Sequence, residues 1–245
     1  MTGASDVAGT SGVAGRPGGV DDGGARAEIL RRVRRALADV PAAERPEDVP
    51  VPRAYARAGS GPAAGSPEVV RLFADRVADY RAAVRVVPAA DVASAVSAAL
   101  AARGAERVVV PHGFPTEWLD GRRPADEPPG SGPTVLRDDP PLSLAALDRV
   151  DGVVTTVAAA IAVTGTFVLD GGAGQGRRAL TLVPDYHLCL VPAARVVASV
   201  PEALTLLDPA RPLTFVSGPS ATSDIELDRI EGVHGPRTLE VLVVT

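Results

Sequence analysis

Lysine is absent from this 245-residue sequence, and all 25 basic residues are arginine. Its absence excludes a lysine Schiff base and a phosphate-binding lysine of the Walker type. The single cysteine, Cys189, excludes a disulfide within the chain and any iron–sulfur or zinc site that needs several thiolates of this chain. Cys189 lies in an apolar run between Leu188 and Val191, which favours a small buried residue over a reactive thiol.

Long apolar runs and an excess of positive charge are missing as well. No segment approaches the roughly 20 apolar residues that a membrane-spanning helix needs, and the N-terminus lacks the charged start and apolar core of a signal peptide. The formal net charge is -5, whereas nucleic-acid and anionic-membrane partners require a basic face. We therefore expect a cytoplasmic protein with no membrane span and no nucleic-acid partner.

The composition along the chain predicts a short N-terminal extension followed by one main domain. Residues 1–24 are mostly Gly, Ala, Ser and Asp, which bury too little surface to become ordered, so they predict a disordered tail. Residues 25–65 predict an amphipathic helix followed by a proline-rich extended connector. We interpret the arginines of this helix as a solvated face; binding of an acidic partner is the alternative. The 46% apolar content supports a folded domain over residues 66–245.

Strand and helix patterns alternate along this domain. Residues 83–87 predict a strand, 91–103 an Ala-rich helix that ends at Gly104, and 107–110 a second strand. Strand–helix–strand with short connections is the signature of a parallel sheet. The glycine-rich segment 170–176 predicts a hairpin loop, which would add an antiparallel portion to the mostly parallel sheet. Further strands are expected near 134–137, 152–156, 159–163, 166–169, 179–182, 187–191, 213–217 and 238–244.

The segment from Thr214 to Ser220 predicts a strand that leads into a glycine turn. Backbone N–H groups of such a turn, at the carboxyl end of a strand, can hold phosphate or carboxylate. An ordinary strand-to-helix turn is the alternative, and spacing alone does not separate the two. The candidate ligand-binding residues are Ser217, Gly218, Pro219, Ser220 and Thr222, and the candidate acid–base residues that follow are Asp224 and Glu226.

A second motif, Gly232-Val-His-Gly-Pro-Arg237, indicates a site more strongly. Flanking glycines let the backbone approach a ligand closely, His234 can act as an acid or a base near neutral pH, and Arg237 can grip a carboxylate or phosphate with two hydrogen bonds. The candidates here are His234 as a catalytic residue and Gly235 and Arg237 as ligand-binding residues. The alternative is a structural turn with an exposed histidine.

Two further segments contribute candidate ligand-binding residues. The turn at Thr164, Gly165 and Thr166 places two hydroxyls beside a glycine, although a plain turn explains it equally well. Asp185 and His187 precede a predicted strand. The three histidines, His112, His187 and His234, lack the close spacing of metal ligands, so we expect no metal site.

Four motifs together resemble one family. Ala162-x-Thr-Gly-Thr166, Leu182-x-Pro-Asp-x-His187, Gly218-Pro-Ser-x-Thr-x-Asp-Ile-Glu226 and Gly232-Val-His-Gly-Pro236 follow one another as in the LUD-domain family, in its lactate-utilization branch. The resemblance covers residues 25–245 and is specific over the last 90 or so. This sequence departs from it at Val163, where the family often has Glu, and at Ala221, where the family often has a polar or basic residue.

The resemblance implies a fold and a pathway. The fold would be a three-layer α/β sandwich similar to the sugar-isomerase and CoA-transferase group, with a mostly parallel sheet. The pathway would be oxidation of L-lactate to pyruvate with two iron–sulfur partner proteins, which would carry the clusters, so no cofactor is expected in this chain. The candidate site would then bind a small anionic metabolite. The alternatives are a transferase or ligase that uses phosphate or CoA esters, and a non-catalytic assembly or regulatory subunit; the sequence is compatible with a homo-oligomer.

Overall fold

The computed structural model describes residues 22–41, 43–48, 50–52, 54, 61–119, 132–222, 230–231 and 234–245. The chain divides into two compact units, residues 1–54 and residues 55–245. The tail predicted over residues 1–24 lies outside the described residues except for the last three, which begin a helix.

The N-terminal unit contains helix α1 (Asp22–Ala36) and a short 3-10 turn at Pro46–Asp48. The apolar side chains of Ile29, Val33 and Leu37 recur at helical spacing and are all about half exposed or more. On the exposed helix surface, Glu28 accepts hydrogen bonds from Arg31 and Arg32. The helix that the sequence predicts from this spacing is confirmed.

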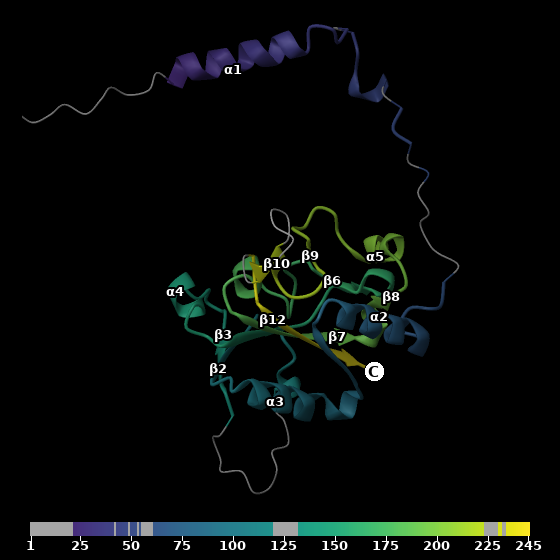
Figure 1. Ribbon diagram of the computed structural model, residues 1–245, viewed down its shortest axis with the longest axis vertical. Coiled ribbons are helices and arrows are strands. Elements are labelled where there is room, and N and C mark those ends of the chain that lie inside the picture. The colour runs from purple at the N-terminus through teal and green to yellow at the C-terminus, as the bar shows by residue number, and fades with distance from the viewer. Residues whose placement is uncertain are drawn as a thin grey trace, which may run out of the picture. The chain divides into compact units, whose positions relative to one another are not determined.

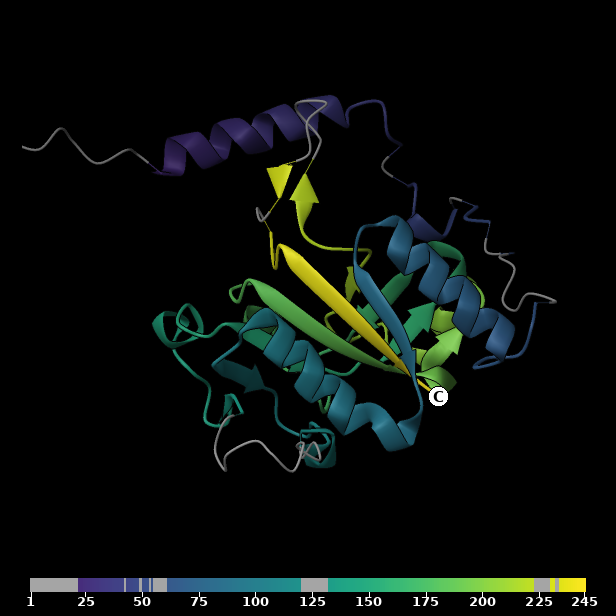
Figure 2. The ribbon, with the colours of Figure 1, turned by 60° about the horizontal axis from the view of Figure 1, so that its bottom comes forward.

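The second unit is built on a six-stranded parallel sheet in the order β1-β12-β7-β4-β2-β3. Figure 2 shows β1, β12 and β7 running side by side in the same direction. The mostly parallel sheet predicted from the sequence is confirmed, although the first two predicted strands are not neighbours in it. The strands of this sheet are β1 (Ala83–Val87), β2 (Arg107–Val110), β3 (Thr134–Arg137), β4 (Gly152–Thr155), β7 (Tyr186–Pro192) and β12 (Thr238–Val244).

A smaller four-stranded sheet, in the order β8-β5-β6-β9, provides the antiparallel portion. It consists of β5 (Ala159–Ile161), β6 (Thr166–Leu169), β8 (Val196–Val197) and β9 (Thr214–Val216). Beyond β9, the two short strands β10 (Ala221–Thr222) and β11 (Ile230–Glu231) pair antiparallel. The remaining helices are α2 (Pro67–Asp79), α3 (Val92–Arg103), α4 (Leu144–Leu147) and α5 (Val200–Leu206). No helix in the described part of the chain is long and apolar enough to span a membrane.

Alternate residues of β7 supply two separate cores on the two faces of the large sheet. Leu188 and Leu190 pack with Leu100 of α3 on one face, whereas Cys189 and Val191 pack with Phe73 of α2 on the other. This alternation follows from the two-residue period of a strand. In Figure 1, α3 lies on one side of the large sheet, and α2 with the small sheet lies on the other. The result is the three-layer α/β architecture that was predicted.

Local chemistry sets the ends of the two main helices. Ser66 caps α2 by accepting a hydrogen bond from the N–H of Val69, and Pro67 occupies its first turn. Gly104 ends α3 in the left-handed conformation, with φ of 67°. The end of α3 at Gly104 agrees with the sequence-based expectation.

One predicted strand is wrong. Residues 179–182 fall mostly in the 3-10 helix η5 (Arg178–Thr181), and the glycine-rich loop 170–176 is consequently not a hairpin. The Arg178 side chain bends back to the carbonyl and hydroxyl oxygens of Thr181, while Leu180 is fully buried. These contacts stabilise a tight turn in a segment whose apolar residues alone suggest a strand.

Candidate functional site

Two of the predicted motifs meet at one surface cavity. The turn Gly218-Pro219-Ser220 and the turn that begins at His234 are joined by two hydrogen bonds: the N–H of His234 donates to Ser220 Oγ at 3.0 Å, and the N–H of Ser220 donates to the carbonyl of Pro236 at 2.9 Å. Both turns need glycine: Gly218 has φ of 85° and a Cβ there would lie 2.5 Å from Cβ of Tyr80, and Gly235 has φ of 149°.

The cavity has a volume of about 280 Å³. It follows the carboxyl end of β9, as expected, but it also lies at the amino ends of β7 and β12, where His187 and Leu239 form part of its wall. The cavity therefore lies beyond the carboxyl end of β9 but at the amino ends of two strands of the large parallel sheet. The lining residues are Arg178, Thr181, His187, Thr214, Phe215, Val216, Ser217, Gly218, Pro219, Ser220, His234, Gly235, Pro236 and Leu239.

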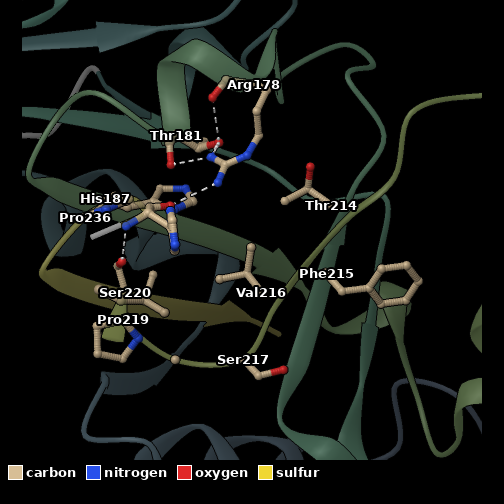
Figure 3. A pocket seen from close by; sticks show the side chains of 14 residues that line it. Arg178, Thr181, His187, Thr214, Phe215, Val216, Ser217, Pro219, Ser220 and Pro236 are labelled. Atoms are coloured by element: carbon tan, nitrogen blue, oxygen red, sulfur yellow. Dashed lines mark hydrogen bonds between the residues drawn. The ribbon is translucent and has the colours of Figure 1, made fainter. Parts of the chain in front are cut away.

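Arg178 supplies the positive charge of this cavity and was not among the candidates predicted from the sequence. In Figure 3, Arg178 and Thr181 border the cavity on one side, and Ser217, Pro219 and Ser220 border it on the other. The Nη1 group donates to the carbonyl and hydroxyl oxygens of Thr181, at 2.7 and 3.1 Å, and Nη2 donates to the carbonyl of His234 at 3.1 Å. Three neutral oxygens thus fix the guanidinium, and no described carboxylate forms an ion pair with it.

His187 lines the cavity with a neutral ring. It is 2% exposed, its Nε2 lies 2.7 Å from the hydroxyl of Thr155, and its ring meets Phe167 edge-on. Burial, together with the positive charge of Arg178, lowers the pKa of His187 to about 3. At neutral pH the imidazole is therefore uncharged, and it contributes a neutral hydrogen-bonding group to the cavity wall.

Hydroxyl groups complete the polar lining. The hydroxyl of Ser217 forms a hydrogen bond of 2.7 Å with the hydroxyl of Thr166 in β6. Thr166 therefore fixes a lining residue without lining the cavity itself. Neighbouring Thr164 and Gly165 do not line it. A Cβ at Gly165, which has φ of 59°, would lie 2.7 Å from the backbone carbonyl carbon of Arg76, which explains why this turn contains glycine. Val163, at the position where the family often has Glu, is half exposed and also lies outside the cavity wall.

Asp185 and Arg237 hold each other outside the cavity wall. Two hydrogen bonds, at 2.7 and 2.8 Å, join the guanidinium to the two carboxylate oxygens. The side-chain hydrogen bond from Arg237 outweighs partial burial and lowers the pKa of Asp185. The carboxylate that Arg237 grips in this structure is thus one of the chain's own, and the pair fixes the entrances of β7 and β12.

The remaining candidates are not placed by the structure. Asp224 and Glu226 lie outside the described residues, and so does the side chain of Thr222. Cys189 is fully buried, and burial raises the pKa of its thiol. Within the described residues, no group of three His, Cys, Asp or Glu side chains is arranged to hold a metal ion.

Comparison with known proteins places the chain in a family. A family model described as the LUD domain matches residues 145–244, which include every residue of the cavity wall. The chain is 45% identical over 227 residues to lactate utilization protein C of Deinococcus radiodurans, an alignment that covers 90% of this chain and 95% of that protein. The chain belongs to the LUD-domain family.

Two further relatives agree with this LUD-domain assignment. Lactate utilization protein C of Geobacillus kaustophilus is 30% identical over 169 residues, which cover 64% of this chain and 70% of that one. The crystal structure of a DUF162 family protein from Deinococcus radiodurans is similar with a TM-score of 0.59 and 43% identity, over 73% of this chain and 97% of that chain.

Proposed function

We propose that this LUD-domain protein is a component of an L-lactate utilization system, in which L-lactate is oxidised to pyruvate together with two iron–sulfur partner proteins. We further propose that its cavity binds the small anionic metabolite of that system. The names of its relatives support the pathway, and the geometry around Arg178 supports the ligand class.

Arg178 is the observation that carries the proposal. A guanidinium has five N–H donors, and the hydrogen bonds of Arg178 to Thr181 and His234 leave Nε–H and one Nη2–H without a partner among the described residues. Because its present partners are neutral oxygens, its charge is not compensated there. A carboxylate is the group that best matches the remaining donors.

The other walls fit a three-carbon 2-hydroxy acid or 2-oxo acid. Hydroxyls of Ser217, Ser220 and Thr214 can donate to or accept from a 2-hydroxyl or 2-oxo oxygen, while Val216 and Leu239 offer apolar surface for a methyl group. A volume of about 280 Å³ accommodates such an anion with water and is small for a CoA ester. This size favours the metabolite-binding hypothesis over the CoA-transferase alternative.

His234 is the residue that we propose as the acid or base. Its backbone is fixed on both sides, by Ser220 at its N–H and by Arg178 at its carbonyl, while its side chain is exposed at the cavity. Asp224 and Glu226 remain proposed acid–base residues from the family motif. Cys189 is excluded from this role because its thiol is buried and its pKa is raised.

Calorimetric titration with L-lactate and with pyruvate tests the ligand. We expect the wild type to bind at least one of them and Arg178→Gln to bind it about tenfold more weakly or worse, because one charge-assisted hydrogen bond contributes about 1.5–3 kcal/mol. Arg149→Gln is the matched control, since Arg149 is exposed and lies outside the cavity. Absence of wild-type binding, or equal binding by both variants, contradicts the proposal.

Co-purification tests the assembly. We expect the protein to be recovered with the two iron–sulfur proteins, and we expect Arg178→Gln to remain in that assembly although it no longer supports growth on L-lactate. If Arg178→Gln supports growth normally, the cavity has no role in the pathway, and a purely structural subunit is the better account.

A further inference from the structure

A second cavity, of about 450 Å³, opens at the carboxyl ends of β2 and β3. Pro111 and His112 follow β2, and Asp138 follows β3. The rest of the wall is formed by Pro141, Gly171, Gly172, Ala173, Gly176, Arg177 and Arg211. We propose that this cavity is a second ligand site, which binds the phosphate or carboxylate group of a small metabolite. It shares no lining residue with the first cavity.

The position is the one that parallel sheets use for ligands. In open α/β sheets, ligands bind beyond the carboxyl ends of the strands. The first cavity lies at the amino ends of β7 and β12, whereas this one lies at the carboxyl ends of β2 and β3 in the same sheet. Its lining also reaches back to residue 111, outside the segment that matches the LUD-domain model.

The glycine-rich loop is fixed against the end of β2 by its backbone. The N–H of Gly174 donates to the carbonyl of His112 at 2.8 Å, and the carbonyl of Gly174 accepts from the N–H of Thr156 at 2.7 Å. Gly171, Gly174 and Gly176 all have φ near 70°. Side chains at Gly174 and Gly176 would collide with Thr156 and with Pro111, respectively. Gly172, Gly174 and Gly176 donate their N–H groups within the chain, whereas the N–H groups of the lining residues Gly171 and Ala173 have no partner among the described residues and can meet an anion.

Each guanidinium of the cavity is held by an aspartate. Nε and Nη2 of Arg177 donate to the two carboxylate oxygens of Asp138, at 2.8 and 3.0 Å, and the Asp138 side chain is only 5% exposed. Nη1 of Arg211 lies 2.9 Å from Asp170, whose side chain is 13% exposed. The aspartates are therefore more buried than the arginines, whose side chains are about 40% exposed.

Both guanidiniums line the cavity and keep N–H donors that have no partner among the described residues. Nη2 of Arg177 also donates to the carbonyl of Leu142, so Arg177 keeps only its Nη1–H groups, whereas Asp170 contacts Arg211 through Nη1 alone. The remaining donors of the two guanidiniums suit a planar carboxylate or a phosphate. The volume exceeds that of an isolated phosphate ion, and Pro111, Pro141 and Ala173 supply apolar surface for the body of a metabolite. The chemical class is therefore a small molecule that carries one oxyanion group.

Titration with inorganic phosphate and with acetate, followed residue by residue by NMR of the full chain, tests this site. We expect saturable shifts at Gly171, Gly172 and Arg177 with at least one of the two anions. Saturation by phosphate alone assigns a phosphorylated metabolite, and saturation by acetate alone assigns a carboxylate; either supports the site. Absence of saturable shifts with both anions overturns the proposal.

Two variants separate a built site from nonspecific charge. Arg211→Gln should weaken binding about tenfold, the equivalent of one charge-assisted hydrogen bond, whereas Arg149→Gln removes the same charge elsewhere and should leave it unchanged. Gly172→Ala keeps the charge but places a methyl 2.8 Å from Oδ1 of Asp170 and 3.3 Å from Nη2 of Arg211, so it should also weaken binding. Equal affinity in Arg211→Gln and the wild type refutes the site. Arg178→Gln should not affect this titration, so failure at one cavity is distinguishable from failure at the other.

Discussion

Replacement of His187 by Gln should reduce the sensitivity of the fold to acid. Burial, with Arg178 nearby, lowers the pKa of His187 to about 3 in the folded state, whereas an unfolded histidine has a pKa of about 6.5. Between these values the unfolded chain binds a proton that the folded chain does not, so the free energy of unfolding falls as the pH falls.

The magnitude follows from this difference. At about pH 5 the unfolded histidine is protonated and the folded one is neutral, which costs the fold about 2 kcal/mol relative to neutral pH. Glutamine does not titrate and keeps a polar group near Thr155. Thus the loss of stability between about pH 7.5 and about pH 5 should be about 2 kcal/mol smaller in His187→Gln than in the wild type.

Urea unfolding at these two pH values measures the effect. The comparison uses the pH-dependent difference, so it holds even if the variant is less stable at both pH values. His112→Gln is the matched control for loss of one histidine, because its side chain is exposed. Equal loss of stability by His187→Gln and the wild type on acidification would show that His187 is not held neutral at the cavity wall.

Two further predictions concern the frame around the cavities. Gly165→Ala should destabilise the fold by at least about 2 kcal/mol, because its Cβ would lie 2.7 Å from the backbone of Arg76. Gly104→Ala, at a similar φ but with open space around it, should cost only about 1 kcal/mol in the same thermal unfolding assay. Asp138→Asn should cost about 2–3 kcal/mol at neutral pH. Partial burial opposes ionisation of Asp138, but the Arg177 hydrogen bonds prevail and lower its pKa, so the cost should shrink as wild-type Asp138 becomes protonated in acid.

Local patterns were sufficient to predict most of the scaffold. The apolar strands β7 and β12 and the Gly104 end of α3 follow from signals within a few residues of each element. Segment 179–182 was predicted incorrectly because hydrogen bonds from the Arg178 side chain to Thr181 stabilise its turn. The pattern of apolar residues does not predict these hydrogen bonds. The Arg178 side chain also contacts His234, 56 residues away, and no sequence period records such a contact.

The candidate site was foreseen only in part for the same reason. Ser217–Ser220 and His234 precede or follow strands and carry polar groups beside glycine, so each motif was visible locally. Arg178 directly precedes the segment 179–182 that was predicted as a strand, and it was not a candidate, although the Arg177-Arg178 pair after a glycine-rich loop was a signal that could have been used. Arg237 had the expected chemistry, but its partner, Asp185, belongs to the chain itself.

Complementation of growth on L-lactate measures whether the Arg178 cavity takes part in L-lactate utilization. A strain that lacks its own copy of this protein would be complemented with the wild type, Arg178→Gln or Arg149→Gln, with equal protein levels and equal recovery of the iron–sulfur partners verified. Binding of a small anion at the Arg178 cavity predicts growth with the wild type and Arg149→Gln, and loss of growth with Arg178→Gln. Equal growth with all three contradicts it.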